Sequence, residues 1–382
     1  MYVVDILGSR YLWVDCLCIV QDDEDELKQN IHQMQHIFSQ AEFTIVAANG
    51  DDANAGLPVI FAWSRHILPA STVLETIRHV AKDNRGRLRL DKTVWGSRAW
   101  TYQEYEFSDR LLIFANQSFY YECRKGTFYR APLKRVGDGS FKIRNSLWSQ
   151  PIWRYESHVE DYSNRKLTYP DDILNAFMAI MEDESAQSGT KFCWGLPIQN
   201  FSRALLWRQQ ANHNRKDVPF CRRSYGCNMD FPSWTWAEWI GGVQYDLSDT
   251  LRPIEGRVRF VIAWPWEAKY DLQAPTDPFT TGILHIRAQI AVVELAAASP
   301  LQGTKYFEFD LGVYTMTHVQ CILLGIVEKI TAMDLWEVAG YTHLAIAVEQ
   351  DTKGIYRRIG RLRIGKATWD ASKPTEQVIE LG

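Results

Sequence analysis

Residues 95–104, WGSRAWTYQE, bring side chains capable of chemistry together in a helix-compatible segment: Arg98, Trp100 and Glu104. A guanidinium group can hold a phosphate through two parallel hydrogen bonds, which would make Arg98 a binding residue. Its structural alternative is a salt bridge with Asp91 or Glu104. Glu104 has a similar alternative as a helix-surface carboxylate paired with Arg98 or Arg110, and such pairs are common and weak.

A second set of candidates lies at the end of the apolar run at residues 11–20 and in the loop that follows it. Its bulky and β-branched residues, bounded by Gly8 and an acidic segment, predict a buried strand. In a doubly wound sheet, the loop after such a strand borders the ligand crevice. The candidates for ligand contact are therefore Asp15, Cys18, Gln21 and Asp22. The alternative is that Cys16 and Cys18 fill a core and that Asp15 caps a nearby backbone group.

The elements after this run predict how the candidates are positioned. An apolar stripe with helical spacing predicts a helix that begins in the acidic run at residues 22–26: Leu27, Ile31, Met34, Phe38 and Ala41. The β-branched run at 43–48 predicts a second strand. The order strand, helix, strand favours a parallel sheet with a right-handed crossover.

The rest of the chain changes character twice. Residues 97–110 are compatible with a helix, and 110–123 predict two strands around a turn at 115–117. From residue 153 to 207 the pattern is mainly helical. The C-terminal part predicts a β sandwich or barrel. We expect three domains: 1–135 as an α/β domain, 136–245 as a mainly helical region, and 246–382 as a β-rich domain.

Composition excludes several classes of protein. The 382 residues are 46% hydrophobic and carry a net charge of −4, which favours a globular protein without a general attraction to nucleic acid. No apolar run is long enough to cross a bilayer, so we expect a cytoplasmic protein. Seven cysteines without repeated spacing favour reduced thiols.

The sequence lacks complete motifs for a metal site, a serine hydrolase or a common nucleotide-binding fold. The set His213, Cys221 and Cys227 lacks a paired C-x-x-C and a fourth ligand, so we expect no metal site. Consecutive acids at 22–26 point in different directions on a helix and favour a solvated helix start over a cation site. The chain has no G-x-S-x-G, Walker or G-x-G-x-x-G motif. The tryptophans of residues 232–239 predict a core, with a binding platform as the alternative.

Residues 10–50 and 95–104 resemble the second and third blocks of the fungal heterokaryon incompatibility (HET) domain. Downstream segments such as CWGL at 193–196 and PSWTW at 232–236 resemble the region that follows this domain. The first block, roughly Y-x-A-L-S-Y-x-W-G and a helix, has no counterpart, and MYVVDILGSR resembles only the end of that helix. The resemblance implies that a central strand is missing, so we expect a truncated or degenerate copy with reduced stability and activity.

HET domains are distantly similar to TIR domains, whose flavodoxin-like fold includes enzymes that cleave NAD. The TIR pattern places its catalytic glutamate four residues after a tryptophan, and Trp100 and Glu104 have this spacing. The resemblance thus implies an incomplete flavodoxin-like or TIR-like first domain in which Glu104 is catalytic. Cleavage of the nicotinamide glycosidic bond develops positive charge on the ribose, which one carboxylate can stabilise. Because nicotinamide leaves without a proton, no second acid is required.

Two functions follow from the resemblance. The first is a cell-death effector that cleaves NAD as a substrate and needs no cofactor. The second is a non-enzymatic module of fungal allorecognition that recognises a protein partner or associates with itself. An inactive truncated copy is the third outcome.

Overall fold

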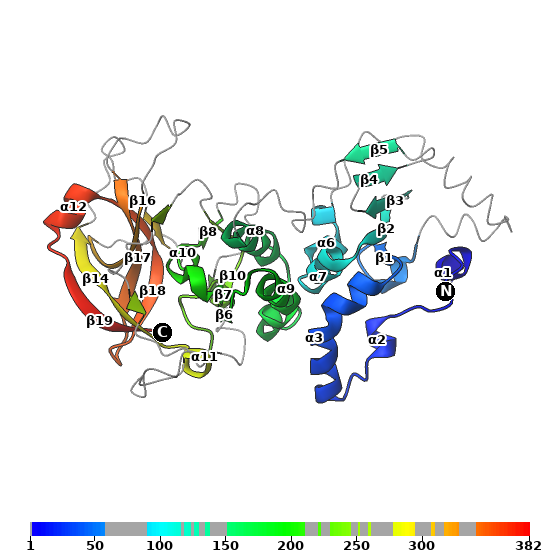
Figure 1. The fold of residues 1–382 in the computed structure, drawn as a ribbon, viewed down its shortest axis with the longest axis horizontal. Helices are drawn as coiled ribbons and strands as arrows, with labels where there is room; N and C mark the ends of the chain where they lie inside the picture. Colours follow the sequence, from blue (N-terminus) through cyan, green and yellow to red (C-terminus); the bar gives the residue numbers. More distant parts are fainter. Residues whose placement is uncertain are drawn as a thin grey trace. The chain divides into compact units, whose positions relative to one another are not determined.

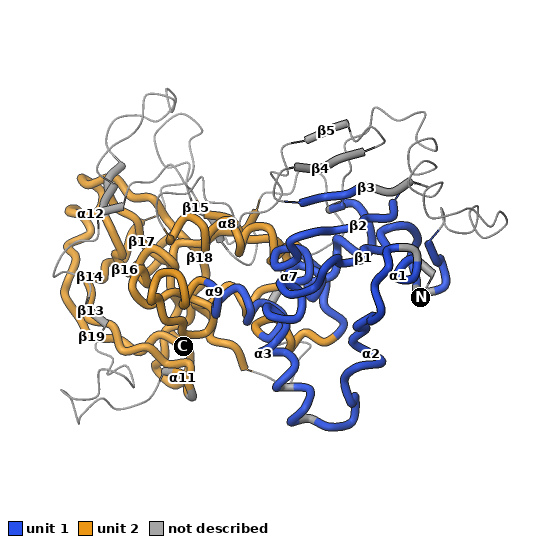
Figure 2. The backbone as a smooth tube through the Cα atoms, turned by 45° about the vertical axis from the view of Figure 1, so that its right-hand side comes forward, with its two compact units in different colours: residues 1–147, 165–168, 175–183 blue, residues 148–164, 169–174, 184–382 orange. Residues whose placement is uncertain are grey.

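The computed structural model contains both helices and strands (Figure 1). It describes residues 2–57, 90–115, 118–123, 126–129, 134–137, 151–210, 221–222, 230–245, 251–252, 259–260, 278–294, 307–309, 317–327 and 341–382. The chain divides into two compact units (Figure 2). Unit 1 contains residues 1–147, 165–168 and 175–183, and unit 2 contains 148–164, 169–174 and 184–382.

Unit 1 contains a five-stranded sheet with the order β1-β2-β3-β4-β5. Its strands are β1 (Thr44–Ala47), β2 (Arg110–Ala115), β3 (Ser118–Cys123), β4 (Gly126–Tyr129) and β5 (Lys134–Gly137). The β1–β2 pair is parallel, and the remaining pairs are antiparallel. The strands expected at 43–48 and 110–123 are confirmed. The parallel neighbour of β1 lies downstream, at β2, and not in residues 11–20.

The predicted helix after the acidic run is confirmed as α3 (Glu24–Gln40). Asp23 caps it, because its Oδ1 accepts hydrogen bonds of 3.0 Å from the backbone N–H groups of Asp25 and Glu26. Phe38, on the predicted stripe, is buried and contacts the Trp13 ring edge-on at 5.8 Å between centroids. The helix start is therefore stabilised by its own acids, as the sequence predicts.

The predicted buried strand at residues 11–20 is wrong. This segment contains the short helix α2 (Asp15–Cys18), which follows the helix α1 (Tyr2–Ile6). Two of its large apolar side chains face solvent, with Tyr11 83% and Leu17 81% exposed. Apolar composition alone cannot make a strand, because backbone groups need a neighbouring strand to pair with, and no described strand pairs with this segment.

The helix α7 (Trp100–Phe107) confirms the helix expected there and follows α6 (Val94–Ser97). Its Tyr105 packs into the core of the sheet together with buried residues of β1 and β2: Val46, Leu111, Ile113 and Ala115. The Tyr105 hydroxyl donates a 2.6 Å hydrogen bond to Glu122 of β3. These contacts fix α7 on the sheet. Residues 58–89 lie outside the described residues, which resume at η2 (Leu90–Lys92).

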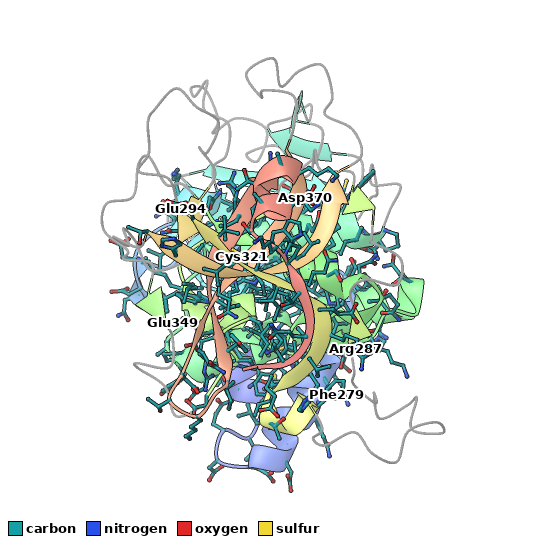
Figure 3. All side chains as sticks on the ribbon, turned by 90° about the vertical axis from the view of Figure 1, so that its left-hand side faces the viewer. Phe279, Arg287, Glu294, Cys321, Glu349 and Asp370 are labelled. Carbon is teal, nitrogen blue, oxygen red and sulfur yellow. The ribbon has the colours of Figure 1, made fainter. Side chains whose placement is uncertain are left out.

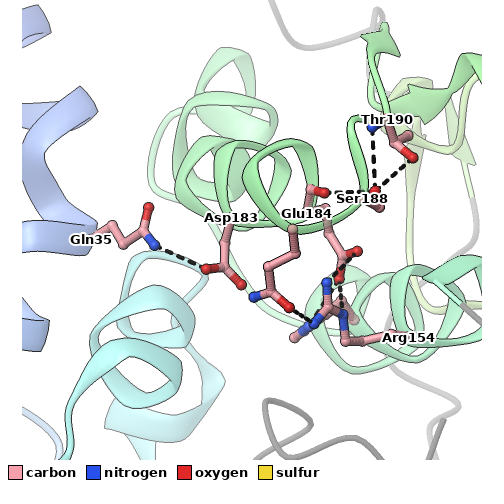
Figure 4. A network of polar contacts seen from close by, with 8 residues as sticks. Gln35, Arg154, Asp183, Glu184, Ser188 and Thr190 are labelled. Atoms are coloured by element: carbon pink, nitrogen blue, oxygen red, sulfur yellow. Dashed lines mark hydrogen bonds and ion pairs between the residues drawn. The ribbon is translucent and has the colours of Figure 1, made fainter. Parts of the chain in front are cut away.

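The helical part of unit 2 begins with α8 (Pro151–Ser163) and includes η4 (Pro170–Ile173), η6 (Ile198–Asn200) and α10 (Phe201–Ala204). The helix α9 (Met178–Ser188) follows η5 (Asn175–Phe177), and of these elements only residues 184–188 belong to unit 2. Arg154 of α8 forms a buried ion pair with Glu184, with hydrogen bonds of 2.5 and 2.8 Å (Figure 4). Arg154 also donates to Gln187. This network ties α8 to the end of α9.

Short strands follow in unit 2: β6 (Phe192–Cys193), β7 (Leu196–Pro197), β8 (Arg208–Gln209), β9 (Cys221–Arg222), β10 (Trp239–Ile240) and β11 (Val243–Gln244). The tryptophans of residues 232–239 are buried, which confirms the predicted core, with Trp234 0%, Trp236 1% and Trp239 1% exposed. Their indole N–H groups donate to protein oxygens: Trp234 to Gly282 O, Trp236 to Tyr155 Oη and Trp239 to Ser233 O, at 2.9, 3.0 and 3.2 Å.

The C-terminal strands form one sheet that closes on itself. Five strands make the ring: β14 (Leu284–Glu294), β16 (His318–Val327), β17 (Tyr341–Gln350), β18 (Tyr356–Gly365) and β19 (Thr375–Leu381). β14 pairs with both β16 and β19, and the single parallel pair Tyr356–Leu381 joins β18 to β19. Cys321, labelled in Figure 3, is fully buried among apolar side chains of these strands. The expected β-rich C-terminal part is confirmed.

The ring carries short additional elements at its margins. They are β12 (Leu251–Arg252), β13 (Arg259–Phe260), α11 (Pro278–Thr281), β15 (Phe307–Phe309) and α12 (Lys366–Ala371). Trp369 of α12 is 1% exposed and belongs to the core inside the ring. The Arg358 side chain of β18 is also fully buried and donates to the carbonyl oxygens of Leu205 and Trp207. These bonds attach the ring to the residues that follow α10 within unit 2.

Candidate functional site

The loop between α6 and α7 positions the predicted catalytic segment. Thr93 caps α6, because its hydroxyl oxygen accepts a 3.0 Å hydrogen bond from the Gly96 backbone N–H. The Thr101 hydroxyl contacts the carbonyl oxygens of Trp95 at 2.6 Å and Arg98 at 2.9 Å. Thr93 thus fixes the start of α6, and Thr101 ties the end of α6 to the first turn of α7.

Trp100 and Glu104 lie one turn apart on α7, so they share a face of the helix. Both side chains are half-buried, whereas their neighbours Thr101, Tyr102 and Gln103 are buried. Glu104 therefore stands at the margin of the packed side of α7. It keeps access to solvent while much of its surroundings is protein.

These surroundings change the acidity of Glu104. Burial raises the pKa of Glu104 from its ordinary value of 4.5 to about 7. The positive charge of Arg98 opposes this shift, the negative charge of Asp15 adds to it, and the positive charge of Arg165 opposes it. A carboxyl with this pKa is about half ionised at neutral pH. Its ionised form can accept a proton or stabilise a nearby positive charge.

Trp95 supplies a direct contact to the same carboxyl. Its indole N–H donates a hydrogen bond to the Glu104 side chain, which lowers the pKa of Glu104. The indole ring also contacts Tyr105 edge-on, with 6.4 Å between the ring centroids. Trp95 is thus part of the candidate site, although the sequence singled out Trp100 and not Trp95.

Asp15 reaches the site from a different element than expected. It begins α2 instead of lying at the end of a buried strand, and its charge acts on Glu104. Its Oδ1 accepts a 2.7 Å hydrogen bond from the backbone N–H of Cys16. The Gln21 side chain donates to the carbonyl oxygens of Asp15 at 3.2 Å and Ile19 at 2.9 Å. Gln21 therefore steadies the turn that carries Asp15.

The other candidates of this segment are not brought to Glu104 by any described contact. Cys16 and Cys18 are exposed free thiols, so the interpretation as core filling is wrong. Cys18 Sγ accepts a 3.4 Å hydrogen bond from the Val14 backbone N–H. Asp22 is exposed just before α3. The ligand contacts expected for Cys18, Gln21 and Asp22 stay predictions.

The alternatives for Glu104 as a simple surface ion pair lose support. Arg110 contacts the Glu42 carbonyl oxygen at 3.5 Å and lies over the Phe43 ring at 6.0 Å. Arg98 is exposed and affects Glu104 by its charge. The Asp91 side chain, its other expected partner, lies outside the described side chains. Because Glu104 is half-buried, its environment differs from that of a solvated helix surface.

Arg165 is a residue of the site that sequence reasoning missed. Its Nη1 donates to the Arg98 carbonyl oxygen and to the Thr101 hydroxyl oxygen, each at 3.2 Å. Its guanidinium lies over the Tyr102 ring, 4.7 Å from the centroid. Arg165 belongs to unit 1 even though α8 precedes it. No local pattern around residue 165 indicates this contact.

Among the described side chains, no group of three or more histidines, cysteines or acids could hold a metal ion. Of the three residues weighed for zinc, His213 and Cys227 lie outside the described residues. The described helices include none with the length and apolar character required to span a membrane.

The family comparison covers the part of the chain that contains α2, Asp15 and Glu104. Residues 1–104 match the family model described as Heterokaryon incompatibility protein (HET). Neither a curated protein nor a solved structure matches the chain. The match includes both predicted blocks, residues 10–50 and 95–104, and ends at the glutamate that the structure surrounds with charge. Residues 1–104 of this chain are therefore similar to the HET domain.

Proposed function

We propose that this protein acts in heterokaryon incompatibility as a cell-death effector that cleaves the nicotinamide glycosidic bond of NAD. The observation that carries the proposal is Glu104: a half-buried carboxyl with a pKa of about 7, hydrogen-bonded by Trp95. The distant TIR-like resemblance of the HET domain supports the choice of NAD as the substrate. The flavodoxin-like arrangement belongs to the same proposal.

The reaction places a clear demand on Glu104. When the bond between ribose C1′ and the nicotinamide nitrogen breaks, its electron pair goes to the nicotinamide, which leaves as a neutral molecule. Positive charge develops on the ribose, and the ionised Glu104 stabilises it. Water then adds to C1′ and loses a proton to solvent. The Trp95 N–H holds the carboxylate in one orientation, so the negative charge does not have to be positioned during the reaction.

NAD turnover by the purified chain tests this function, beside Glu104→Gln and thermal melts of both proteins. The amide keeps the shape of the side chain and removes its charge, so we expect turnover to fall about 100-fold or more. Glu42→Gln is the matched control, because Glu42 is an exposed carboxylate of unit 1 that accepts a 3.0 Å hydrogen bond from Ser9. Turnover that survives in folded Glu104→Gln, or its absence from a folded wild type, contradicts the proposal.

A second candidate function is a recognition or self-association module without catalysis. Four apolar side chains of residues 11–20 are exposed in unit 1: Tyr11 83%, Leu12 39%, Leu17 81% and Val20 49%. Exposed apolar groups that gather in one segment are typical of surfaces that bind another protein. Sedimentation of the wild type and Leu17→Ser at several concentrations distinguishes this function. Association that Leu17→Ser abolishes, in a chain without NAD turnover, favours it.

A further inference from the structure

A basic segment from outside the HET-matched residues lies beside Glu104. Lys166 forms an isolated parallel β-bridge with Arg98. The Ala99 N–H donates to the Lys166 carbonyl oxygen at 2.8 Å, and the Lys166 N–H donates to the Ser97 carbonyl oxygen at 2.6 Å. Two backbone bonds in this register fix residue 166 directly opposite residue 98.

The bridge also determines where the two side chains point. Paired residues of a β-bridge extend to the same face, because side-chain direction alternates along each extended backbone. Arg98 and Lys166 are both exposed. Two cationic side chains therefore stand next to one another at the entrance to α7, where an anion can contact both.

Arg165 holds the backbone of this pair in place. Its hydrogen bond to the Arg98 carbonyl oxygen, at 3.2 Å, holds the backbone that carries the Arg98 side chain. Its stacking on Tyr102 and its bond to Thr101 keep its positive charge close to the start of α7. Arg98 and Arg165 both lower the pKa of Glu104, so their charges act on the space around that carboxyl. Two cations, Arg98 and Arg165, thus act on a single carboxylate, and Lys166 lies opposite Arg98 in the bridge.

This charge arrangement suits a substrate with two different ends. A ribose that becomes positive belongs next to Glu104, and a phosphate belongs next to the cations. We propose that Arg98 and Lys166 form a phosphate-binding site for a ribonucleoside diphosphate substrate, with Arg165 as the positioning residue. The inference rests on the proposed function for the identity of the substrate, and it assigns a binding role to residues 165–166 beyond the HET-matched segment.

Binding of ADP-ribose tests the site without catalysis, because this molecule has the diphosphate and no nicotinamide bond to cleave. Calorimetry on the full chain compares the wild type with Arg98→Gln, Lys166→Gln and the double variant. Each single change is expected to weaken binding about fivefold, as for a solvent-accessible ionic contact. A roughly tenfold increase in salt is expected to weaken wild-type binding more than binding by the double variant.

Two controls make the result specific. Lys353→Gln removes an exposed lysine of unit 2 and is expected to bind ADP-ribose as the wild type does. Adenosine, which lacks phosphate, is expected to show no difference among the variants. ADP-ribose affinity that is unchanged in folded Lys166→Gln, or no saturable binding to the wild type, overturns the inference. NAD turnover is measured separately. The enzyme proposal can therefore fail while the phosphate-binding site is confirmed, and the phosphate-binding site can fail while NAD turnover is observed.

Discussion

The Trp95 indole N–H donates a hydrogen bond to the Glu104 carboxyl, from the helix that precedes α7. Trp95 is itself packed against the core of unit 1 and contacts Tyr105. A donor with a packed ring has little freedom to turn away, so it holds the acceptor in one orientation. Neighbouring residues therefore set both the orientation of the Glu104 carboxyl and its ionisation.

The first prediction concerns the pH dependence of NAD turnover. Only the ionised form of Glu104 can stabilise positive charge on ribose, and the pKa of Glu104 is about 7. We therefore expect kcat to rise with pH up to a midpoint near 7 and then to level off, with roughly a tenfold rise per pH unit well below the midpoint. Initial rates at saturating NAD from pH 5 to 9 check this. A flat profile would mean that Glu104 does not titrate in the rate-limiting step.

The second prediction uses Trp95→Phe. Phenylalanine keeps an aromatic ring against Tyr105 but removes the N–H that donates to Glu104. Because that bond stabilises the ionised carboxylate, its loss raises the pKa of Glu104, and the midpoint of the rate profile moves to higher pH. A net hydrogen bond of about 1 kcal/mol corresponds to a shift of roughly 0.7 pH unit. A profile that falls in height without moving would assign Trp95 a purely structural role.

The third prediction concerns the stability of unit 1. The folded-state pKa of Glu104 is raised above its ordinary value of 4.5, so the folded state binds more protons between pH 4.5 and 7. The free energy of unfolding is therefore highest below pH 4.5, as far as Glu104 contributes, and falls as pH rises through 7. The loss is up to about 3 kcal/mol. Urea unfolding of the wild type and Glu104→Gln at pH 5 and 8 measures it, and the difference between the two pH values is expected to shrink in the variant.

Local patterns predicted the elements whose signals lie within one segment. The apolar stripe and the acidic start of α3, the β-branched run of β1 and the alternating C-terminal strands are all visible in neighbouring residues. Trp100 and Glu104 were singled out by their resemblance to the TIR spacing, and the structure places them one helical turn apart on α7. A local sequence pattern can predict a helix or strand without information about the elements that pack against it.

The failures have a common physical cause. Residues 11–20 have the composition of a strand, yet whether they form one depends on a neighbour with free backbone groups. Lys166 reaches the site through backbone bonds to Ser97 and Ala99, and Arg165 does so through a side-chain bond to the Arg98 carbonyl oxygen. These partners lie more than sixty positions earlier in the sequence. A contact at that separation leaves no periodicity and no spacing to recognise. The domain boundaries expected at 135 and 245 depend on such contacts too, and they stay predictions.

The last prediction concerns the buried ion pair of unit 2. Arg154 holds Glu184 through two hydrogen bonds, and the two side chains are only 10% and 3% exposed. Arg154→Leu leaves the Glu184 charge without its bidentate partner in a poorly hydrated place, so it is expected to cost about 3 kcal/mol of unfolding free energy. The matched control is Lys366→Leu in the exposed pair with Asp370, where the expected change is below about 0.5 kcal/mol. Equal effects of the two changes on chemical unfolding would show that the Arg154–Glu184 pair does not hold α8 to α9.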